Sequence, residues 1–203
     1  MTTIYNENVT GMILAGGKAR RMGGQDKGLI EINGQAMIQY VLDVLKPQVS
    51  EILINANRNV SEYEKFAYPV ISDQLEDYQG PLAGIAAAMD AVNTKYICTC
   101  PCDGPLIAED LVTRLFSALN STNEDIHIAV AHDGQRLQPV YALIDCDLHK
   151  SLLDYLSSGE RKIDQWYAQN NFKTVDFSDK KDCFININTP EDQQTISQHL
   201  ATK

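Results

Sequence analysis

The chain has 203 residues, of which 44% are hydrophobic, and a formal net charge of −10 at pH 7. The length suits one α/β domain whose core needs neither disulfides nor a metal, and the acidic balance argues against a protein that coats nucleic acid. No apolar stretch approaches the roughly 20 residues that span a bilayer, and no basic segment followed by an apolar one opens the chain, so we expect a cytoplasmic protein without a membrane partner.

The first predicted element is a buried strand at residues 9–14, which runs into a loop rich in glycine and cationic side chains. The loop contains Gly16, Gly17, Gly23, Gly24 and Gly28, together with Lys18, Arg20, Arg21 and Lys27. Glycines let backbone N–H groups approach an anion, and the cations supply charge where phosphate oxygens gather. Because the spacing matches neither of the two commonest glycine motifs, the residues alone leave a phosphate-binding loop and a plain surface loop as alternatives.

Strand-like and helix-like segments then alternate, which predicts a mainly parallel sheet with helices on its faces. Apolar residues at helical spacing predict a helix at residues 36–45, which Pro47 ends. In chain order there follow strands at 51–55 and 69–72, an alanine-rich helix at 82–92, a strand at 96–100 and a helix at 108–119.

Beyond residue 125 the pattern is less regular. It predicts strands at 126–131 and 137–144, helices at 148–156 and 163–169, and extended segments at 172–177 and 183–187. The charged stretch at 179–182 is interpreted as a solvated turn. A final helix is predicted from Thr189 and Pro190, which are typical of an N-cap and a first helical position.

Cysteines cluster on one predicted strand. Cys98, Cys100 and Cys102 alternate, so their side chains should leave one face of the sheet. The spacing of zinc ligands is missing, so we expect free, buried thiols packed like small hydrophobic residues.

Polar residues follow three predicted strands, at the edge where open α/β sheets bind ligands. They are Asn55, Asp73 and Asp103. Asp103 lies between prolines and beside a glycine, where a carboxylate is well placed to hold a divalent cation with phosphate oxygens. A turn residue is the alternative interpretation of Asp103, and to an even greater degree of Asp73.

The loop motif matches the pattern L-A-G-G-x-x-x-R-M-G-x-x-D-K of nucleotidyltransferases through Leu14-Ala-Gly-Gly, Arg21-Met-Gly and Asp26-Lys27. Asn55-Ala-Asn, the segment 80–84, Pro101-Cys-Asp and Asn186-Ile-Asn188-Thr-Pro-Glu-Asp follow in order. With these motifs the chain resembles the molybdenum cofactor guanylyltransferase family from about residue 10 to 192. The resemblance implies a Rossmann-like, three-layer α/β fold of the nucleotide-diphospho-sugar transferase type.

The resemblance also implies an activity, the transfer of GMP from GTP to the terminal phosphate of molybdopterin with release of pyrophosphate. Mg²⁺ would assist, with Mn²⁺ as an alternative, and Arg21, Lys27 and Asp103 would be the catalytic residues. One domain would span residues 1–203, with a nucleotide-binding half at about 9–125 and an acceptor-binding half at about 126–192. By analogy, transient contacts with cofactor-assembly and molybdoenzyme-maturation proteins are expected.

Further roles follow from matched positions. The positions that match the family's GTP contacts are Leu14, Ala15, Gly16, Lys27, Asn55, Asp73 and Asp103, and Asp103 also matches the metal ligand. The positions that match its pterin side are Arg136, Arg161, Asn186 and Asn188, although the last can equally mark only the start of a helix.

Other functions stay open on the residues alone. A related enzyme could use CTP with the same pterin, or activate a sugar 1-phosphate. A non-catalytic nucleotide-binding regulator is disfavoured because Arg21, Lys27 and Asp103 are all present. A purely structural module leaves the clustered cations unexplained.

Overall fold

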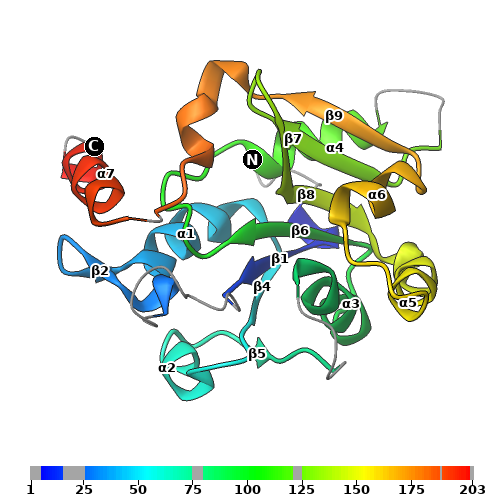
Figure 1. Ribbon diagram of the computed structural model, residues 1–203, viewed down its shortest axis with the longest axis horizontal. Helices are drawn as coiled ribbons and strands as arrows, with labels where there is room; N and C mark the ends of the chain where they lie inside the picture. Colours follow the sequence, from blue (N-terminus) through cyan, green and yellow to red (C-terminus); the bar gives the residue numbers. More distant parts are fainter. Residues whose placement is uncertain (1–5, 16–25, 75–79, 121–124, 188, 202–203) are drawn as a thin grey trace.

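The computed structural model describes residues 6–15, 26–74, 80–120, 125–187 and 189–201. Within these ranges seven strands form one sheet in the order β5-β4-β1-β6-β8-β7-β9 (Figure 1). The strands are β1 (Val9–Leu14), β4 (Glu51–Asn55), β5 (Val70–Ile71), β6 (Tyr96–Pro101), β7 (Ile128–His132), β8 (Leu137–Asp145) and β9 (Phe172–Asp176). Only the pairings that involve β8 are antiparallel among the described strands of this sheet, which confirms the mainly parallel arrangement.

Helices cover both faces of the sheet because neighbouring side chains on a strand point to opposite faces. Ile13 of β1 faces α1 (Met37–Leu45) and α4 (Leu111–Asn120). Met12 belongs to the opposite core, which is formed with α3 (Pro81–Ala91), α5 (His149–Ser157) and α6 (Ile163–Ala168). In Figure 1, α1 lies on the left of the sheet and α3, α5 and α6 lie on its right. The predicted three-layer architecture is therefore confirmed.

The central strands place a ligand edge between β1 and β6. The chain passes from β1 through α1 to β4 on one side, and through α3 to β6 on the other. This reversal of strand order is a topological switch point, where open sheets hold ligands beyond the carboxyl ends of the strands. Leu14 pairs with Asn55 of β4 and with Pro101 of β6, so the predicted site residues that follow these strands share one edge.

Two short elements were not predicted from the sequence. A hairpin of β2 (Glu31–Ile32) and β3 (Gln35–Ala36) turns at Asn33 and Gly34, which both have positive φ, as the two-residue hairpin turn requires. Helix α2 (Val60–Glu64) follows Asn59, whose φ is also positive. Asn-Gly is a recognised hairpin signal, whereas a five-residue helix leaves too short a period to detect.

The extended segment predicted at 183–187 is wrong in its first two residues. Cys183 and Phe184 instead end a run of 3₁₀ turns, η5 (Ser178–Phe184). The reason is aromatic packing, because the Phe184 ring meets the rings of Tyr141 and Phe177 edge-on at centroid distances of 4.9 and 5.6 Å.

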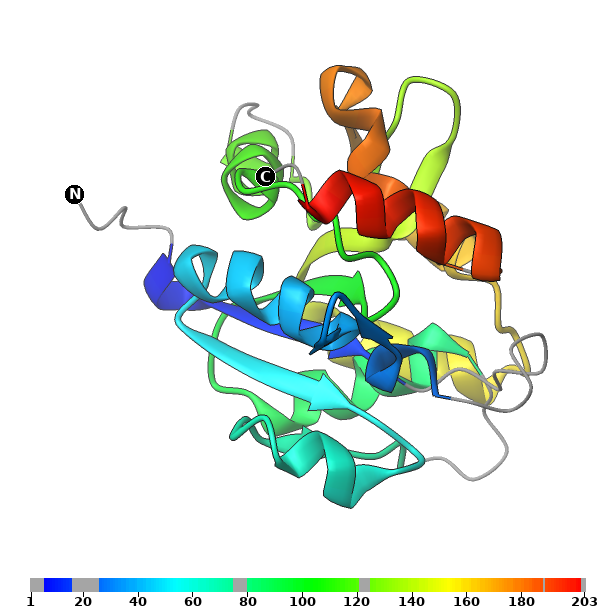
Figure 2. The same cartoon turned by 90° about the vertical axis from the view of Figure 1, so that its left-hand side faces the viewer.

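The last helix, α7 (Pro190–Ala201), begins as predicted. The Thr189 hydroxyl accepts from the Asp192 N–H, and the Asp192 carboxylate accepts from the Thr189 N–H, at 3.1 and 2.9 Å. This is a reciprocal N-terminal cap. Figure 2 shows α7 (red) beside the blue β2–β3 hairpin, and the Ser197 hydroxyl donates to the Asn33 side chain across this contact.

The remaining sequence expectations concern cysteines and membrane-spanning segments. Cys98, Cys100 and Cys102 are buried in the same core cluster, and all five cysteines are free thiols. Burial raises the pKa of the Cys98 thiol to about 12, so it stays protonated. In the described part of the chain, no helix has the length and apolar character to cross a membrane.

Candidate active site

Lys27 and Asp103 meet at the ligand edge of the sheet. The Lys27 Nζ atom lies 2.9 Å from Asp103 Oδ2, and the two side chains are 21% and 16% exposed. Lys27 opens a short 3₁₀ helix, Lys27–Leu29, whereas Asp103 follows β6. An ammonium and a carboxylate at this exposure remain accessible to a ligand yet are partly shielded from solvent, which strengthens their interactions with other charges.

Backbone hydrogen bonds fix the turn that carries Asp103. The Cys102 N–H donates to the Leu14 carbonyl at 3.1 Å and continues the β1–β6 pairing by one residue. On the other side, the Ile187 N–H donates to the Asp103 carbonyl at 3.0 Å. The backbone that carries Asp103 is thus held between β1 and the segment that ends at Ile187.

The thiol next to Asp103 is not a nucleophile. Burial, followed by the negative charge of Asp103, raises the pKa of Cys102, and the side chain is 6% exposed. A neutral, buried thiol is chemically inert. Cys102 therefore does not supply a nucleophile at this edge.

Asn55 and Asp73 form a second polar cluster on the same edge. The Asn55 amide donates to one carboxylate oxygen of Asp73 at 3.0 Å, and the Asn57 amide donates to the other at 2.8 Å. The Asp73 N–H in turn donates to the Asn57 side-chain oxygen at 2.8 Å. The structure therefore brings together two predicted site residues, and it shows that Asp73 orients the Asn55 amide.

A glycine allows this cluster to lie against α3. A Cβ atom added to Gly84 would lie 2.4 Å from the Asn55 side-chain oxygen and 3.1 Å from a methyl carbon of Leu14. Only glycine fits without moving one of these predicted site residues. Gly84 thus lets the helix approach the ends of β1 and β4 closely.

The residues that end β1 are also at this edge. Leu14 is half-buried and Ala15 is buried, and the Ala15 N–H donates to the Asn55 carbonyl at 2.8 Å. Gly16, Arg21 and the other loop residues between 16 and 25 lie outside the described residues, whereas Lys27 and Gly28 at the end of the loop are described.

Two of the predicted acceptor-side residues, Arg136 and Asn186, line one cavity of about 300 Å³. The other lining residues are Asp133, Gln138, Lys181, Phe184 and Ile185. The largest cause that holds the pKa of Asp133 below its usual range is the hydrogen bond from the backbone N–H of Arg136. This carboxylate is therefore charged at neutral pH. Lys181 and Arg136 give the cavity two cationic side chains, which suits an anionic group.

The cavity adjoins Asp103 through Asn186. The Tyr141 hydroxyl donates to the Asn186 side-chain oxygen at 3.4 Å, and the same oxygen would lie 3.3 Å from a Cβ atom added to Gly104. Tyr141 reaches this point because a β-bulge in β8 shifts the register opposite Val130 and Ala131. Bulges commonly redirect a side chain beside a binding site.

Neither of the other two predicted acceptor residues is among the described residues that line this cavity. Arg161 follows the end of α5, where its guanidinium donates to the carbonyls of Leu156 and Glu160, and it is not among the residues that line the Arg136 cavity. Asn188 lies outside the described residues.

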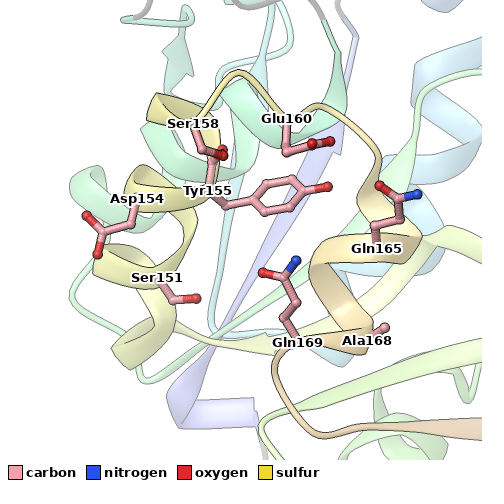
Figure 3. Close-up of a pocket in the computed structure, with 8 residues that line it drawn as sticks. All are labelled: Ser151, Asp154, Tyr155, Ser158, Glu160, Gln165, Ala168 and Gln169. Atoms are coloured by element: carbon pink, nitrogen blue, oxygen red, sulfur yellow. The ribbon is translucent and has the colours of Figure 1, made fainter.

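A larger cavity, of about 740 Å³, lies between α5 and α6 (Figure 3). Figure 3 shows the Tyr155 ring reaching from α5 toward α6. Among the described residues that line this cavity, Asp154 and Glu160 are acidic and none is basic. Its chemistry therefore suits a phosphorylated ligand poorly.

Sequence reasoning missed several residues of these sites. Tyr141 meets Asn186 from the part of β8 where the register shifts, and Lys181 lines its cavity from η5, where a solvated turn was predicted. Neither feature has a local signal. Asp133, which lies between the strands predicted at 126–131 and 137–144, also lines the cavity.

The residues at the ligand edge fit a divalent cation that is held mainly by phosphate oxygens. Among the described residues, no three His, Cys, Asp or Glu side chains gather as a metal site. Asp103 offers a carboxylate whose Oδ2 atom already holds the Lys27 ammonium. Mg²⁺ usually takes one or two carboxylates together with phosphate oxygens and water, so Asp103 and a bound triphosphate would together suffice.

Comparisons with known proteins agree with this geometry. The family model described as the MobA-like NTP transferase domain matches residues 11–174. The chain is 51% identical over 193 residues to the molybdenum cofactor guanylyltransferase of Shewanella sediminis (strain HAW-EB3), a match that covers 95% of this chain and 97% of that one. It is 50% identical over 193 residues to the protein of the same name from Shewanella loihica (strain ATCC BAA-1088 / PV-4), with the same two coverages.

Solved structures share the fold. Molybdopterin-guanine dinucleotide biosynthesis protein A from Archaeoglobus fulgidus superposes with a TM-score of 0.78 at 21% identity, over 96% of this chain and 100% of that one. The 2-C-methyl-D-erythritol 4-phosphate cytidylyltransferase from Thermus thermophilus gives a TM-score of 0.67 at 13% identity, over 95% and 98% of the two chains. The predicted nucleotide-diphospho-sugar transferase type of fold is confirmed.

Proposed function

Because this chain belongs to the MobA-like NTP transferase family, we propose that it is a molybdenum cofactor guanylyltransferase. It transfers GMP from GTP to the terminal phosphate of molybdopterin, releases pyrophosphate and forms the guanine dinucleotide cofactor. The observation that carries the proposal is the Lys27–Asp103 pair at the switch point, in a chain 51% identical to a protein of that name.

The reaction requires positioning of the reactants and charge neutralisation more than covalent catalysis by the protein. An oxygen of the acceptor phosphate attacks the α-phosphorus of GTP in line. The bond from that phosphorus to the bridging oxygen breaks, and the electron pair leaves with pyrophosphate. A phosphate oxygen is already ionised at neutral pH, so the protein needs no general base, in keeping with the neutral thiol of Cys102.

The residues of the ligand edge have different roles in this reaction. Lys27, together with Arg21, stabilises the negative charge that builds on the leaving pyrophosphate. Leu14, Ala15, Gly16 and the Asn55–Asp73 pair hold the nucleotide, and Gly84 sets the distance between α3 and the nucleotide. Asp103 would hold a divalent cation, Mg²⁺ or Mn²⁺, which would supply Lewis-acid neutralisation of the phosphates.

The cavity lined by Arg136, Lys181 and Asn186 holds the acceptor. Its two cations favour the phosphate of molybdopterin, and Asn186 places it beside the turn of Asp103. The nucleotide half at about 9–125 and the acceptor half at about 126–192 share one sheet, so the two ligands meet between β6 and β8. Transient delivery of the acceptor by cofactor-assembly proteins, and of the product to molybdoenzyme-maturation proteins, belongs to this proposal.

The reaction takes place in the cytoplasm. The support for this is that all five cysteines are free thiols, which is typical of a reducing compartment.

A transfer assay tests the proposed function. Purified protein is incubated with molybdopterin, Mg²⁺ and either GTP, CTP or UTP, while pyrophosphate release and the dinucleotide product are measured. Product with GTP alone supports the proposal. Product with CTP alone would identify a cytidylyltransferase, and nucleotide binding without pyrophosphate release would identify a regulator.

A further inference from the structure

Asp26, the residue before Lys27, is buried, and both of its carboxylate oxygens accept hydrogen bonds from one neighbouring segment. It is 9% exposed, and the Tyr63 hydroxyl donates to its Oδ1 atom at 2.5 Å. The Asn59 amide donates to its other carboxylate oxygen at 3.1 Å. Both donors belong to the short helix α2 or its N-cap, whereas the Lys27 side chain extends to Asp103.

The Tyr63 hydroxyl lies directly under the segment that carries Lys27. A Cβ atom added to Gly28 would lie 2.6 Å from this hydroxyl and 3.1 Å from the Cys102 side chain. Residues 26–28 are therefore enclosed between α2 and the turn before Asp103. Tyr63 itself is completely buried, and burial, reinforced by the neighbouring Cys102 and Asp26, raises the pKa of its phenol, which keeps it a hydrogen-bond donor.

A buried carboxylate is costly unless its oxygens are hydrogen-bonded, so these donors determine where Asp26 can lie. The backbone that leaves Asp26 fixes the starting point of the Lys27 side chain. Displacement of Asp26 by a fraction of an ångström would move the ammonium away from its position beside Asp103, where phosphate charge must be met.

We infer that Tyr63 and Asn59 are positioning residues, which act through Asp26 to hold the Lys27 ammonium at the triphosphate site. Neither touches the reacting atoms. The inference rests on the proposed function, because it takes Lys27 as a nucleotide contact. It adds that α2 controls nucleotide affinity indirectly, without itself contacting the nucleotide.

The test is a double-mutant cycle with Tyr63→Phe and Lys27→Ala, read by calorimetric titration of each full-length protein with GTP in the presence of Mg²⁺. Tyr63→Phe keeps the ring and removes the donor. We expect it to weaken GTP binding about tenfold in the wild-type background, as the loss of a hydrogen bond to a charged group implies. In the Lys27→Ala background we expect less than about a twofold change, because residues that act through one another are not additive.

Tyr167→Phe is the matched control. Tyr167 is also completely buried, and its hydroxyl donates to the Pro139 carbonyl at 2.8 Å on the opposite side of the sheet. This variant should lose a comparable amount of thermal stability and leave GTP affinity unchanged. Asn59→Gly is a second test variant, since glycine accepts the positive φ at this position and removes the side chain whose amide donates to Asp26.

The outcomes separate this inference from the proposed function. Unaltered GTP affinity in both Tyr63→Phe and Asn59→Gly, with Lys27→Ala clearly weakened, would overturn the inference alone. An equal loss from Tyr63→Phe in both backgrounds would also overturn it, because the effect would then bypass Lys27. Absence of GTP binding by the wild type, or no effect of Lys27→Ala, would overturn the nucleotide role of Lys27 and the inference with it.

Discussion

The Lys27 ammonium lies 2.9 Å from the Asp103 carboxylate, although 76 positions separate the two residues in the chain. Each follows a central parallel strand, and the switch point between β1 and β6 brings them together. A cation and an acid in this arrangement can neutralise phosphates from two sides, one directly and the other through a divalent ion.

Asp103→Ala should reduce the transfer rate by about 10²–10³-fold, which corresponds to the several kcal/mol of charge stabilisation that a catalytic metal supplies. Steady-state pyrophosphate release with saturating GTP and Mg²⁺ measures the effect. Asp154→Ala, at an exposed acid on α5 that pairs with Lys150, is the control and should leave the rate unchanged. Near-normal turnover by a folded Asp103→Ala protein would remove Asp103 from the metal role.

Lys27→Ala should weaken GTP binding by about 10–100-fold, since a charge-assisted hydrogen bond contributes about 1.5–3 kcal/mol. The dissociation constant from calorimetry measures the loss. Lys150→Ala, which removes an equally long cation from an exposed pair, should bind GTP as the wild type does. If calorimetry returns the same affinity for Lys27→Ala, the ammonium is not a phosphate contact.

Gly84→Ala should weaken GTP binding by about tenfold while the fold is kept. Alanine favours a helix over glycine by about 1 kcal/mol, but the added Cβ atom would push Asn55 away from Asp73. Calorimetry and thermal unfolding together separate these two effects. In an Asn55→Ser background the loss from Gly84→Ala should shrink, and a full loss there would show that Asn55 does not transmit it.

Arg136→Ala should raise the KM for the molybdopterin acceptor by about tenfold and leave GTP affinity unchanged, because Arg136 lines the acceptor cavity. Arg161→Ala is the variant to compare with Arg136→Ala, since both arginines match positions on the family's pterin side. Initial rates at varied acceptor concentration measure both variants. An increase in KM for Arg161→Ala alone would move the acceptor site away from the Arg136 cavity.

The stability that Arg114 contributes should depend on pH. Arg114 pairs with Asp110 and with both carboxylate oxygens of Asp179, and Lys180 also reaches Asp110. The hydrogen bond from Arg114 is the largest cause that holds the pKa of Asp179 below its usual range. For Asp110, burial opposes the shift, but the bonds from Lys180 and Arg114 outweigh it and the pKa is again lowered.

A carboxyl group whose pKa is lower in the folded state stabilises the fold above its unfolded pKa, about 3.9 for aspartate. This contribution is lost as the pH falls through the lower, folded pKa. The melting temperature of Arg114→Gln should therefore lie furthest below that of the wild type at pH 6–7, and the two should converge as the pH falls below about 4. A difference in melting temperature that stays constant down to pH 2–3 would contradict this account.

Local signals in the sequence determined most of the scaffold. The apolar period of residues 36–45 and the N-cap at Thr189 lie within single elements, so the structure differs from the prediction there by no more than a residue. The alternation of strands and helices was enough to predict a mainly parallel sheet. It was also enough to predict that Asn55, Asp73 and Asp103 follow strands at one edge, because parallel strands end together.

Contacts between distant segments could be decided only by the tertiary structure. Residues 179–182 were predicted to be a solvated turn, but Asp179 forms a bidentate pair with Arg114, 65 positions away. The placement of Asp26 by Tyr63, and of Asn186 by Tyr141 through a bulge, likewise depends on partners that no local pattern reveals. Periodicity records which face of an element is buried, whereas the partner that a polar side chain meets depends on how the packed layers align.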